Sequence, residues 1–284
     1  MNNDRIQEIL DLMEEARLDY FLISDPQSIA YCTGYYNNPH ERMFVFMISK
    51  HGNHTLFMND LFYLEHDLGV NIVWHKDGQD AIQTIVDEMH FPGRIGIDKN
   101  WASHFLLDLM KKLPDAKYIN ASPCVDLVRM KKDLQEQVLM IESSKINDAV
   151  MEEIIPFIQE GVTEKQLAKK LDELFFNHHS TCYGAIVAFG KNAADPHHEN
   201  DDTPLRKGDC VLIDMGCVYK GYCSDMTRTF FYEGILEEEI KVYEIVKKAN
   251  EAAEAMIKPG VKLSDIDKCA RKVISDEGYG KYFT

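Results

Sequence analysis

The segment Gly208–Phe231 reads GDCVLIDMGCVYKGYCSDMTRTFF and predicts a β-hairpin with one aspartate on each side of its turn, Asp214 and Asp225. A β-branched run leads into Asp214, and Val218–Gly221 has the composition of a tight turn. Asp225 precedes the segment Met226–Phe231, whose alternating pattern predicts the returning strand. The pattern therefore predicts an acidic side chain on each side of one turn, close to the interior of a sheet.

The position of the turn decides how close the two carboxylates come. If the turn centres near Tyr219 and Lys220, Asp214 and Asp225 become cross-strand neighbours, with Cβ atoms about 4.5–5.5 Å apart. Two carboxylates that close repel each other unless one is protonated or a cation lies between them. The alternative is a pair of turn-flanking acids that point into water. The apolar run before Asp214 predicts that the pair lies near the sheet interior. We therefore favour a divalent metal ion between the carboxylates over a pair that points into water.

Composition excludes several classes of partner. The chain has 284 residues, of which 45% are hydrophobic and 27% are charged, as expected for a globular protein with a substantial core. Its formal net charge of −16 would repel nucleic acids and anionic membranes. No nucleic-acid or membrane partner is therefore expected.

The cysteines and the N-terminus indicate a cytoplasmic protein. Seven cysteines are scattered without a CxxC pair, which favours free thiols in a reducing compartment. The first seventeen residues are polar and lack the apolar core of a signal peptide, and no run of about 18 apolar residues predicts a membrane helix.

The pattern of helices and strands predicts an α/β fold with two domains. Residues 1–128 alternate short apolar strands with amphipathic helices, and residues 129–284 begin with a long helix expected to run to Ile158. In the first domain the expected helices cover Arg5–Ala16, Gln79–Met89 and Trp101–Leu113, and the expected strands cover Tyr20–Ile23, Met43–Ile48, Thr55–Met58, Asn71–Trp74 and Arg94–Ile97.

The second domain contains an internal repeat with an offset of 99 positions, from Gly161 to Gly260. Each copy is predicted to be a helix, a Gly-Val turn and a second helix, although two amphipathic helices can resemble each other by chance. Strands follow the first copy, whereas the sequence ends at Thr284 shortly after the second. The matching residues are Ile141, Ile146, Ile158, Gly161, Val162 and Leu167 with Ile240, Ile245, Ile257, Gly260, Val261 and Ile266.

A third candidate functional residue is His197, in the segment Phe189–His198. This segment reads as a strand end that runs into a loop, where catalytic groups are commonly displayed. A histidine there could donate a hydrogen bond to a substrate carbonyl or transfer a proton, or it could be a solvated loop residue. Two aspartates offer at most four oxygen ligands and no histidine follows His198, so the predicted metal site is incomplete.

These motifs resemble those of the pita-bread metallopeptidases, in the branch of Xaa-Pro dipeptidases (prolidases) and Xaa-Pro aminopeptidases. The matches are Asp-Met-Gly at 214–216, Gly-Tyr-Cys-Ser-Asp-Met-Thr-Arg-Thr at 221–229, Asn-Ala-Ala-Asp-Pro-His at 192–197 and Gly-Val-Thr-Glu at 161–164. The resemblance covers essentially the whole chain. It implies a creatinase-like α/β domain over residues 1–128 and the first part of a pita-bread α+β catalytic domain over residues 129–284.

The resemblance also implies a mechanism. Asp214 and Asp225 would be metal ligands, with Asp225 contributing to both of two divalent ions, and His197 would contact the substrate at the scissile amide. A hydroxide bridging two Mn²⁺ or Co²⁺ ions would attack the carbonyl that precedes proline, and Zn²⁺ is also compatible with such ligands. The substrates would be dipeptides or short peptides containing proline, and the enzyme would be a homodimer.

One departure from the family pattern leaves other functions open. The family's later histidine segment and two further glutamate ligands would follow Thr284, so we expect the chain as given to bind metal weakly or not at all. One alternative is a catalytically inactive binding protein on the same scaffold. Another is a creatinase-like amidinohydrolase, which is disfavoured because it would keep two adjacent carboxylates without a cation.

Overall fold

A computed structural model describes residues 1–283 and divides the chain into two compact units, Met1–Lys132 and Asp133–Thr284. The sequence pattern placed this boundary four residues earlier, at the start of one long helix from Arg129. The structure instead ends a helix at Met130 and starts the next at Leu134. The carboxylate of Asp133 accepts a hydrogen bond from the backbone N–H of Glu136 at 2.8 Å, and such a cap fixes where a helix begins.

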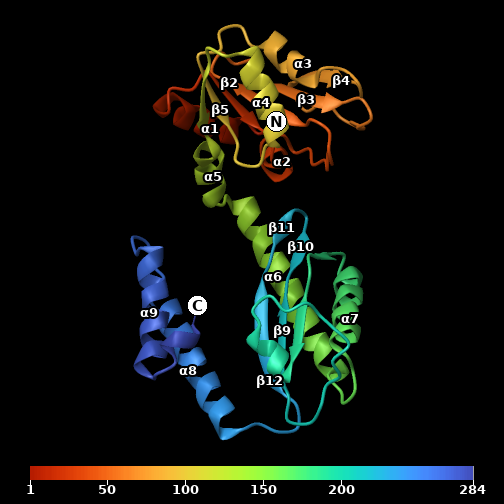
Figure 1. The fold of residues 1–284 in the computed structure, drawn as a ribbon, viewed down its shortest axis with the longest axis vertical. Coiled ribbons are helices and arrows are strands. Elements are labelled where there is room, and N and C mark those ends of the chain that lie inside the picture. Colours follow the sequence, from red (N-terminus) through yellow and green to blue (C-terminus); the bar gives the residue numbers. More distant parts are fainter. Residues whose placement is uncertain (284) are drawn as a thin grey trace. The chain divides into compact units, whose positions relative to one another are not determined.

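The N-terminal unit is built on a six-stranded mixed sheet with the strand order β4-β3-β2-β1-β5-β6 (Figure 1). The central strand β1 pairs antiparallel with β2 and parallel with β5. The predicted bounds of β1 and β5 are those observed, whereas β6 was not predicted. The strands are β1 (Tyr20–Ile23), β2 (Val45–Ser49), β3 (Thr55–Asn59), β4 (Asn71–His75), β5 (Arg94–Ile97) and β6 (Lys117–Asn120).

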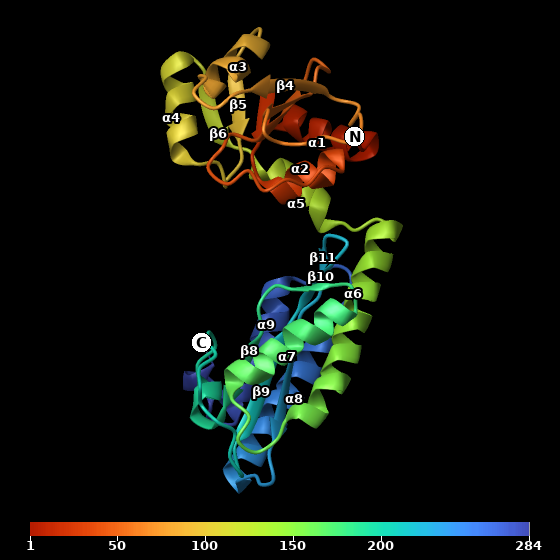
Figure 2. The same ribbon diagram turned by 90° about the vertical axis from the view of Figure 1, so that its right-hand side faces the viewer.

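Helices cover both faces of this sheet (Figure 2). Phe21 and Ile23 of β1 pack into one apolar core with α1, α2 and α5, while Tyr20 and Leu22 pack into a second core with α3 and α4. All four side chains are buried, because alternate residues of a strand point to opposite faces. The helices are α1 (Asn3–Glu15), α2 (Pro26–Thr33), α3 (Ala81–Glu88), α4 (Ser103–Lys112) and α5 (Ser122–Met130).

The C-terminal unit contains two three-stranded sheets, with orders β11-β10-β7 and β12-β9-β8. Within residues 1–283, no helix is long and apolar enough to cross a bilayer. The strands are β7 (Thr181–Cys182), β8 (Ile186–Phe189), β9 (Cys210–Met215), β10 (Cys217–Tyr219), β11 (Tyr222–Cys223) and β12 (Met226–Phe231). The helices are α6 (Leu134–Ile154), η1 (Ile155–Phe157), α7 (Glu164–Asn177), η2 (Gly190–Ala194), α8 (Glu237–Glu254), α9 (Leu263–Asp276) and η3 (Gly280–Tyr282).

Helices α6 and α7 lie side by side and cover one face of the β12-β9-β8 sheet (Figure 2). The core between them contains Leu167, Leu171 and Phe175 of α7 with Val211 and Ile213 of β9, all fully buried. Met215 of β9 belongs to the same core, and because the side chains of a strand alternate, Cys210, Leu212 and Asp214 point to the opposite face of the sheet. That opposite face holds the predicted acidic residues.

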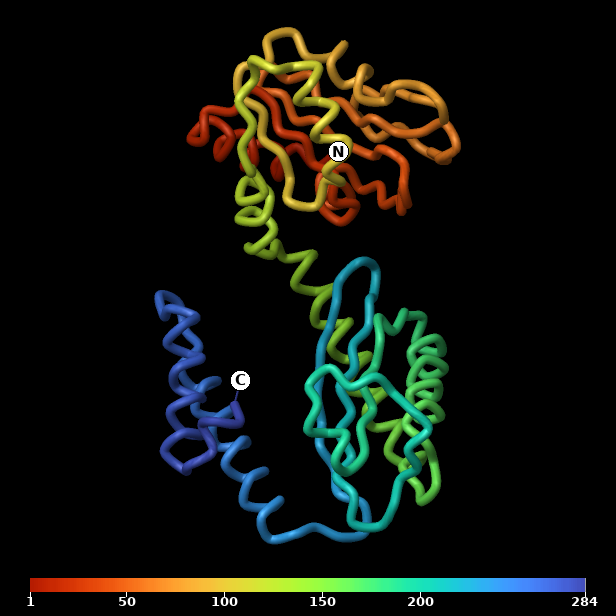
Figure 3. The backbone as a smooth tube through the Cα atoms, viewed as in Figure 1, coloured from red at the N-terminus to blue at the C-terminus, as the bar shows by residue number. Residues whose placement is uncertain are grey.

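The internal repeat is present as two helix–turn–helix segments, α6–η1–α7 and α8–α9 (Figure 3). Helix α9 has the bounds of α7 shifted by 99 positions. Each turn contains a glycine in the left-handed region, Gly161 with φ 81° and Gly260 with φ 89°, where residues with a side chain are strained. The two copies therefore share their turn chemistry as well as their apolar pattern.

Candidate functional site

Asp214 lies in the middle strand of the β12-β9-β8 sheet, on the face turned away from α6 and α7. Its neighbours Ile213 and Met215 are buried in the core, whereas Asp214 is half-buried. Its register partners are Ile186 on β8 and Thr227 on β12. The hydroxyl of Thr227 donates a hydrogen bond to the Asp214 carboxylate at 2.7 Å, which fixes the orientation of the carboxylate.

Asp225 lies on the same face, although the expected direct pairing with Asp214 is wrong. The turn centres on Lys220 and Gly221, whose φ angles of 47° and 84° fit a two-residue hairpin turn. This shifts the register by two residues, so that Thr227 stands opposite Asp214. Asp225 immediately precedes β12, and its side chain is exposed. Because it lies two residues before Thr227, it points to the same face as Asp214 and is its diagonal neighbour. Such neighbours have Cα atoms about 7–8 Å apart.

The aromatic side chain of Tyr183 lies next to both carboxylates, and the sequence pattern did not indicate it. Its hydroxyl donates a hydrogen bond to the backbone carbonyl of Ser224 at 2.7 Å. Burial raises the pKa of Tyr183, and the nearby negative charges of Asp225 and Asp214 raise it further. Gly216 makes room for the ring, because a Cβ atom there would lie 2.1 Å from the tyrosine oxygen. The charges of Asp214 and Asp225 therefore both act on the Tyr183 hydroxyl.

The two aspartates are suited to hold a cation. Among the described residues, no lysine, arginine or histidine forms an ion pair with Asp214 or Asp225, and their one side-chain donor is the Thr227 hydroxyl. Carboxylate oxygens are the ligands that hard divalent cations prefer. A bound cation would relieve the repulsion between the two groups, although four oxygens alone leave a dinuclear centre short of ligands.

His197 lies in the loop after η2, and its side chain is exposed. Its backbone N–H donates to the Asp195 carboxylate at 3.0 Å, which forms a tight turn. In the chain up to Phe283, the imidazole makes no hydrogen bond. The structure therefore leaves the side chain accessible and brings it into no contact with the aspartates, so its catalytic role stays a prediction.

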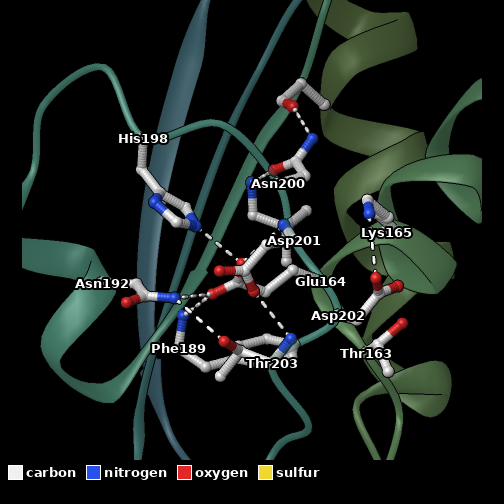
Figure 4. Close-up of polar contacts among 12 residues, drawn as sticks. Thr163, Glu164, Lys165, Phe189, Asn192, His198, Asn200, Asp201, Asp202 and Thr203 are labelled. Carbon is white, nitrogen blue, oxygen red and sulfur yellow. Dashed lines mark hydrogen bonds and ion pairs between the residues drawn. The ribbon is translucent and has the colours of Figure 1, made fainter.

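A second cluster of polar side chains, not singled out from the sequence, lies around Glu164 (Figure 4). Ligand-type atoms of Glu164, His198 and Asp201 lie within 4.8 Å of one another. Glu164 is fully buried at the start of α7, His198 is largely buried and Asp201 is exposed. One weak signal was present in the sequence, since Glu164 ends the Gly-Val-Thr-Glu turn. Its hydrogen-bond partners lie 25–37 residues further along the chain.

Two family models match the chain. The model described as metallopeptidase family M24 matches residues 138–284, and the model described as the creatinase/prolidase N-terminal domain matches residues 5–131. Among curated proteins, an uncharacterized peptidase of Staphylococcus aureus (strain bovine RF122 / ET3-1) is 31% identical over 288 residues, covering 98% of this chain and 80% of that protein.

Solved structures show the same fold. A dipeptidase from Pyrococcus horikoshii OT3 is 33% identical with a TM-score of 0.88, covering 98% of this chain and 79% of its own. A prolidase from Thermococcus sibiricus is 29% identical with a TM-score of 0.90, covering 100% of this chain and 80% of the prolidase chain. An Xaa-Pro dipeptidase from Bacillus anthracis is 26% identical with a TM-score of 0.88, covering 98% and 78%.

Proposed function

The chain belongs to metallopeptidase family M24, and on that premise we propose that the product of the whole gene hydrolyses Xaa-Pro bonds in dipeptides or short peptides with the help of two divalent metal ions. It is a peptidase with a creatinase-type N-terminal domain and a pita-bread domain. The proposed specificity rests on similarity to proteins named prolidase and Xaa-Pro dipeptidase.

The observation that carries the proposal is the pair Asp214 and Asp225 on one face of the β12-β9-β8 sheet. They share this face without a cationic partner among residues 1–283, and Thr227 holds the first of them in place. Their oxygens would hold the metal ions. When bound, such ions polarise a peptide carbonyl and supply a nucleophilic water at neutral pH.

The other proposed roles belong to residues around this pair. Thr227 keeps an Asp214 oxygen oriented, and the accessible imidazole of His197 would donate a hydrogen bond to the carbonyl of the scissile amide. We propose Mn²⁺ or Co²⁺ as the metal, with Zn²⁺ as the other candidate, because oxygen-rich sites select such ions by geometry. Solution scattering or ultracentrifugation would test whether the protein is a homodimer.

The alternative functions have less support. The similar structures quoted above are those of peptidases, which does not favour an amidinohydrolase or an inactive binding protein. The described cysteines are free, which supports the proposal of a reducing compartment such as the cytoplasm.

The test is hydrolysis of an Xaa-Pro dipeptide in Mn²⁺ by the purified product of the whole gene, compared with a dipeptide of the same first residue followed by alanine. We expect turnover of the proline substrate, and its reduction to background in Asp225→Ala. The control is Asp148→Ala, which removes an exposed carboxylate of α6 and should leave the rate unchanged. Wild-type rates in Asp225→Ala would contradict the proposed metal ligand.

A further inference from the structure

Glu164 is a buried carboxylate for which the proposed reaction has no direct use. It is the first residue of α7, whose start is fixed by a capping box between Thr163 and Gln166. An acidic residue in the first helical turn is usually exposed and interacts with the helix dipole. Glu164 instead has 0% of its side chain exposed. Burying a carboxylate is unfavourable unless hydrogen bonds compensate for the lost water.

Both oxygens of Glu164 accept hydrogen bonds from one loop, which begins at Phe189 and ends at Asp201 (Figure 4). Oε1 accepts from the backbone N–H of Phe189 and from the Asn192 amide, each at 2.9 Å. Oε2 accepts from the backbone N–H of Asp201 at 3.0 Å and lies 2.6 Å from Nε2 of His198. One carboxylate therefore holds the beginning, the middle and the end of this loop.

A metal ion at this cluster would have to displace these donors. A carboxylate offers about four lone-pair sites, and those of Glu164 face four donors. Asp201 is exposed, and its carboxylate accepts a hydrogen bond from the backbone N–H of Thr203 at 2.7 Å. The cluster is therefore built as a hydrogen-bonded anchor.

The anchored loop carries His197 between its fixed points. His198, the next residue, points inward to Glu164, whereas the His197 side chain is exposed (Figure 4 shows His198). Asn200 adds a second attachment: its amide accepts from the Val187 N–H and donates to the Ala185 carbonyl, each at 2.7 Å. Because the His197 imidazole makes no hydrogen bond within residues 1–283, its position depends on the backbone that these contacts hold.

We propose that Glu164 is a positioning residue, which fixes the loop from Phe189 to Asp201 and thereby presents His197 to the substrate. This inference rests on the proposed function in one respect, the contact between His197 and the scissile amide. The anchoring itself is independent of that function. A misplacement of about 1 Å in a group that orients a substrate can reduce the rate on the order of 10²-fold.

The test is Glu164→Gln, which keeps the size of the side chain but replaces one acceptor oxygen with an NH₂ group. The matched control is Glu160→Gln, at an exposed glutamate in the turn before α7. Hydrogen exchange should become about 10-fold faster or more in peptides that cover residues 189–201, and the ring signal of His197 should shift in NMR spectra. Exchange in α6 and in the N-terminal unit should stay as in the control.

Kinetics form the second arm of this test. In the product of the whole gene, with Mn²⁺ and an Xaa-Pro dipeptide, kcat of Glu164→Gln should fall about 10-fold or more, with KM and bound Mn²⁺ close to the control values. Asn192→Ala is a milder variant that removes one donor and keeps Glu164. It should speed exchange near Asn192 and lower kcat by a smaller factor.

The outcomes separate this inference from the proposed function. A wild-type protein without Xaa-Pro hydrolysis would contradict the proposed function. The exchange rates and the His197 signal would still test whether Glu164 holds the loop from Phe189 to Asp201. Unchanged exchange in Glu164→Gln, or faster exchange with an unmoved His197 signal and an unchanged kcat, would overturn the positioning role.

Discussion

The two acidic sites of the C-terminal unit differ in what their carboxylates already contact. Glu164 is fully buried and faces four donors of one loop. Asp214 is half-buried and Asp225 is exposed, and in the described part of the chain the pair receives one side-chain donor, the Thr227 hydroxyl. Glu164 belongs to a cluster with the residue types of a metal site. Its oxygens already face hydrogen-bond donors, whereas most oxygens of Asp214 and Asp225 face no side-chain donor among the described residues.

From this difference we expect a cation to bind where acceptor oxygens are free, and not where the acidic residues are already surrounded by donors. A carboxylate surrounded by donors is compensated within the protein, and replacing it exposes those donors to an apolar environment. Two carboxylates that share a face with a single donor, the Thr227 hydroxyl, repel each other, so a cation would stabilise them. Variants at the two sites should therefore differ in the size of their effects on stability.

The largest effect is expected at the buried site. Glu164→Ala leaves four donors without an acceptor and should lower the free energy of unfolding by about 3–5 kcal/mol. Urea denaturation followed by circular dichroism measures this loss. The control Glu160→Ala, at an exposed position, should change stability little. An equal loss in both variants would show that the buried hydrogen bonds of Glu164 add no stability.

The next effect concerns the orientation of Asp214. Thr227→Val removes the hydroxyl that donates to the carboxylate and should weaken Mn²⁺ binding about 10–100-fold, as expected for a residue that orients a metal ligand. Calorimetric titration of the product of the whole gene with Mn²⁺ measures the affinity. Thr229→Val, further along β12 and opposite Leu212, is the control and should bind Mn²⁺ as the wild type does. Equal affinities in the two variants would show that Thr227 does not orient a ligand.

A smaller effect is expected at Tyr183. Tyr183→Phe loses the hydrogen bond to the Ser224 carbonyl and should reduce stability by about 1 kcal/mol. Tyr219→Phe changes a tyrosine whose hydroxyl makes no hydrogen bond among the described residues, so its stability should stay at the wild-type value. Chemical denaturation measures the free energy of unfolding of both variants. A larger loss in Tyr219→Phe than in Tyr183→Phe would contradict the hydrogen bond between Tyr183 and the Ser224 carbonyl.

The smallest effect is expected at the exposed site without metal. Asp225→Asn removes one of two repelling charges, so the metal-free protein should keep its stability within about 0.5 kcal/mol. The same variant should lose any stabilisation that Mn²⁺ gives to the wild type. Thermal denaturation with and without Mn²⁺ measures both quantities. A large loss of stability in the metal-free variant would mean that Asp225 is a structural residue.

Much of the fold could be predicted because its signals are local. The apolar runs at Tyr20–Ile23 and Arg94–Ile97 are observed as β1 and β5 with the predicted bounds. Strand β6 was missed because Lys117–Asn120 is short and half exposed, so it lacks an apolar run. The long helix predicted from Arg129 is interrupted, since the Asp133 cap was not recognised in a charged segment.

The positions of the two aspartates were predicted in outline but not in register, and their role as metal ligands stays a prediction. Asp214 and Asp225 share a sheet face as expected, but Lys220 and Gly221 form the turn, and a shift of one residue at a turn moves cross-strand partners by two. The role of Glu164 was missed because its donors come from a distant loop, and no periodicity relates them to α7. Tyr183 was missed for the same reason.

Paramagnetic broadening by Mn²⁺ in backbone amide spectra measures which carboxylates bind the cation, and it detects weak binding as well as tight binding. Signals of Asp214, Asp225 and Thr227 should broaden at the lowest Mn²⁺ concentrations, and Asp225→Asn should abolish this response. Signals of Glu164 and Asp201 should broaden only at higher concentrations. Broadening that begins at Glu164 and Asp201, or that persists unchanged in Asp225→Asn, would show that the paired aspartates are not the metal site.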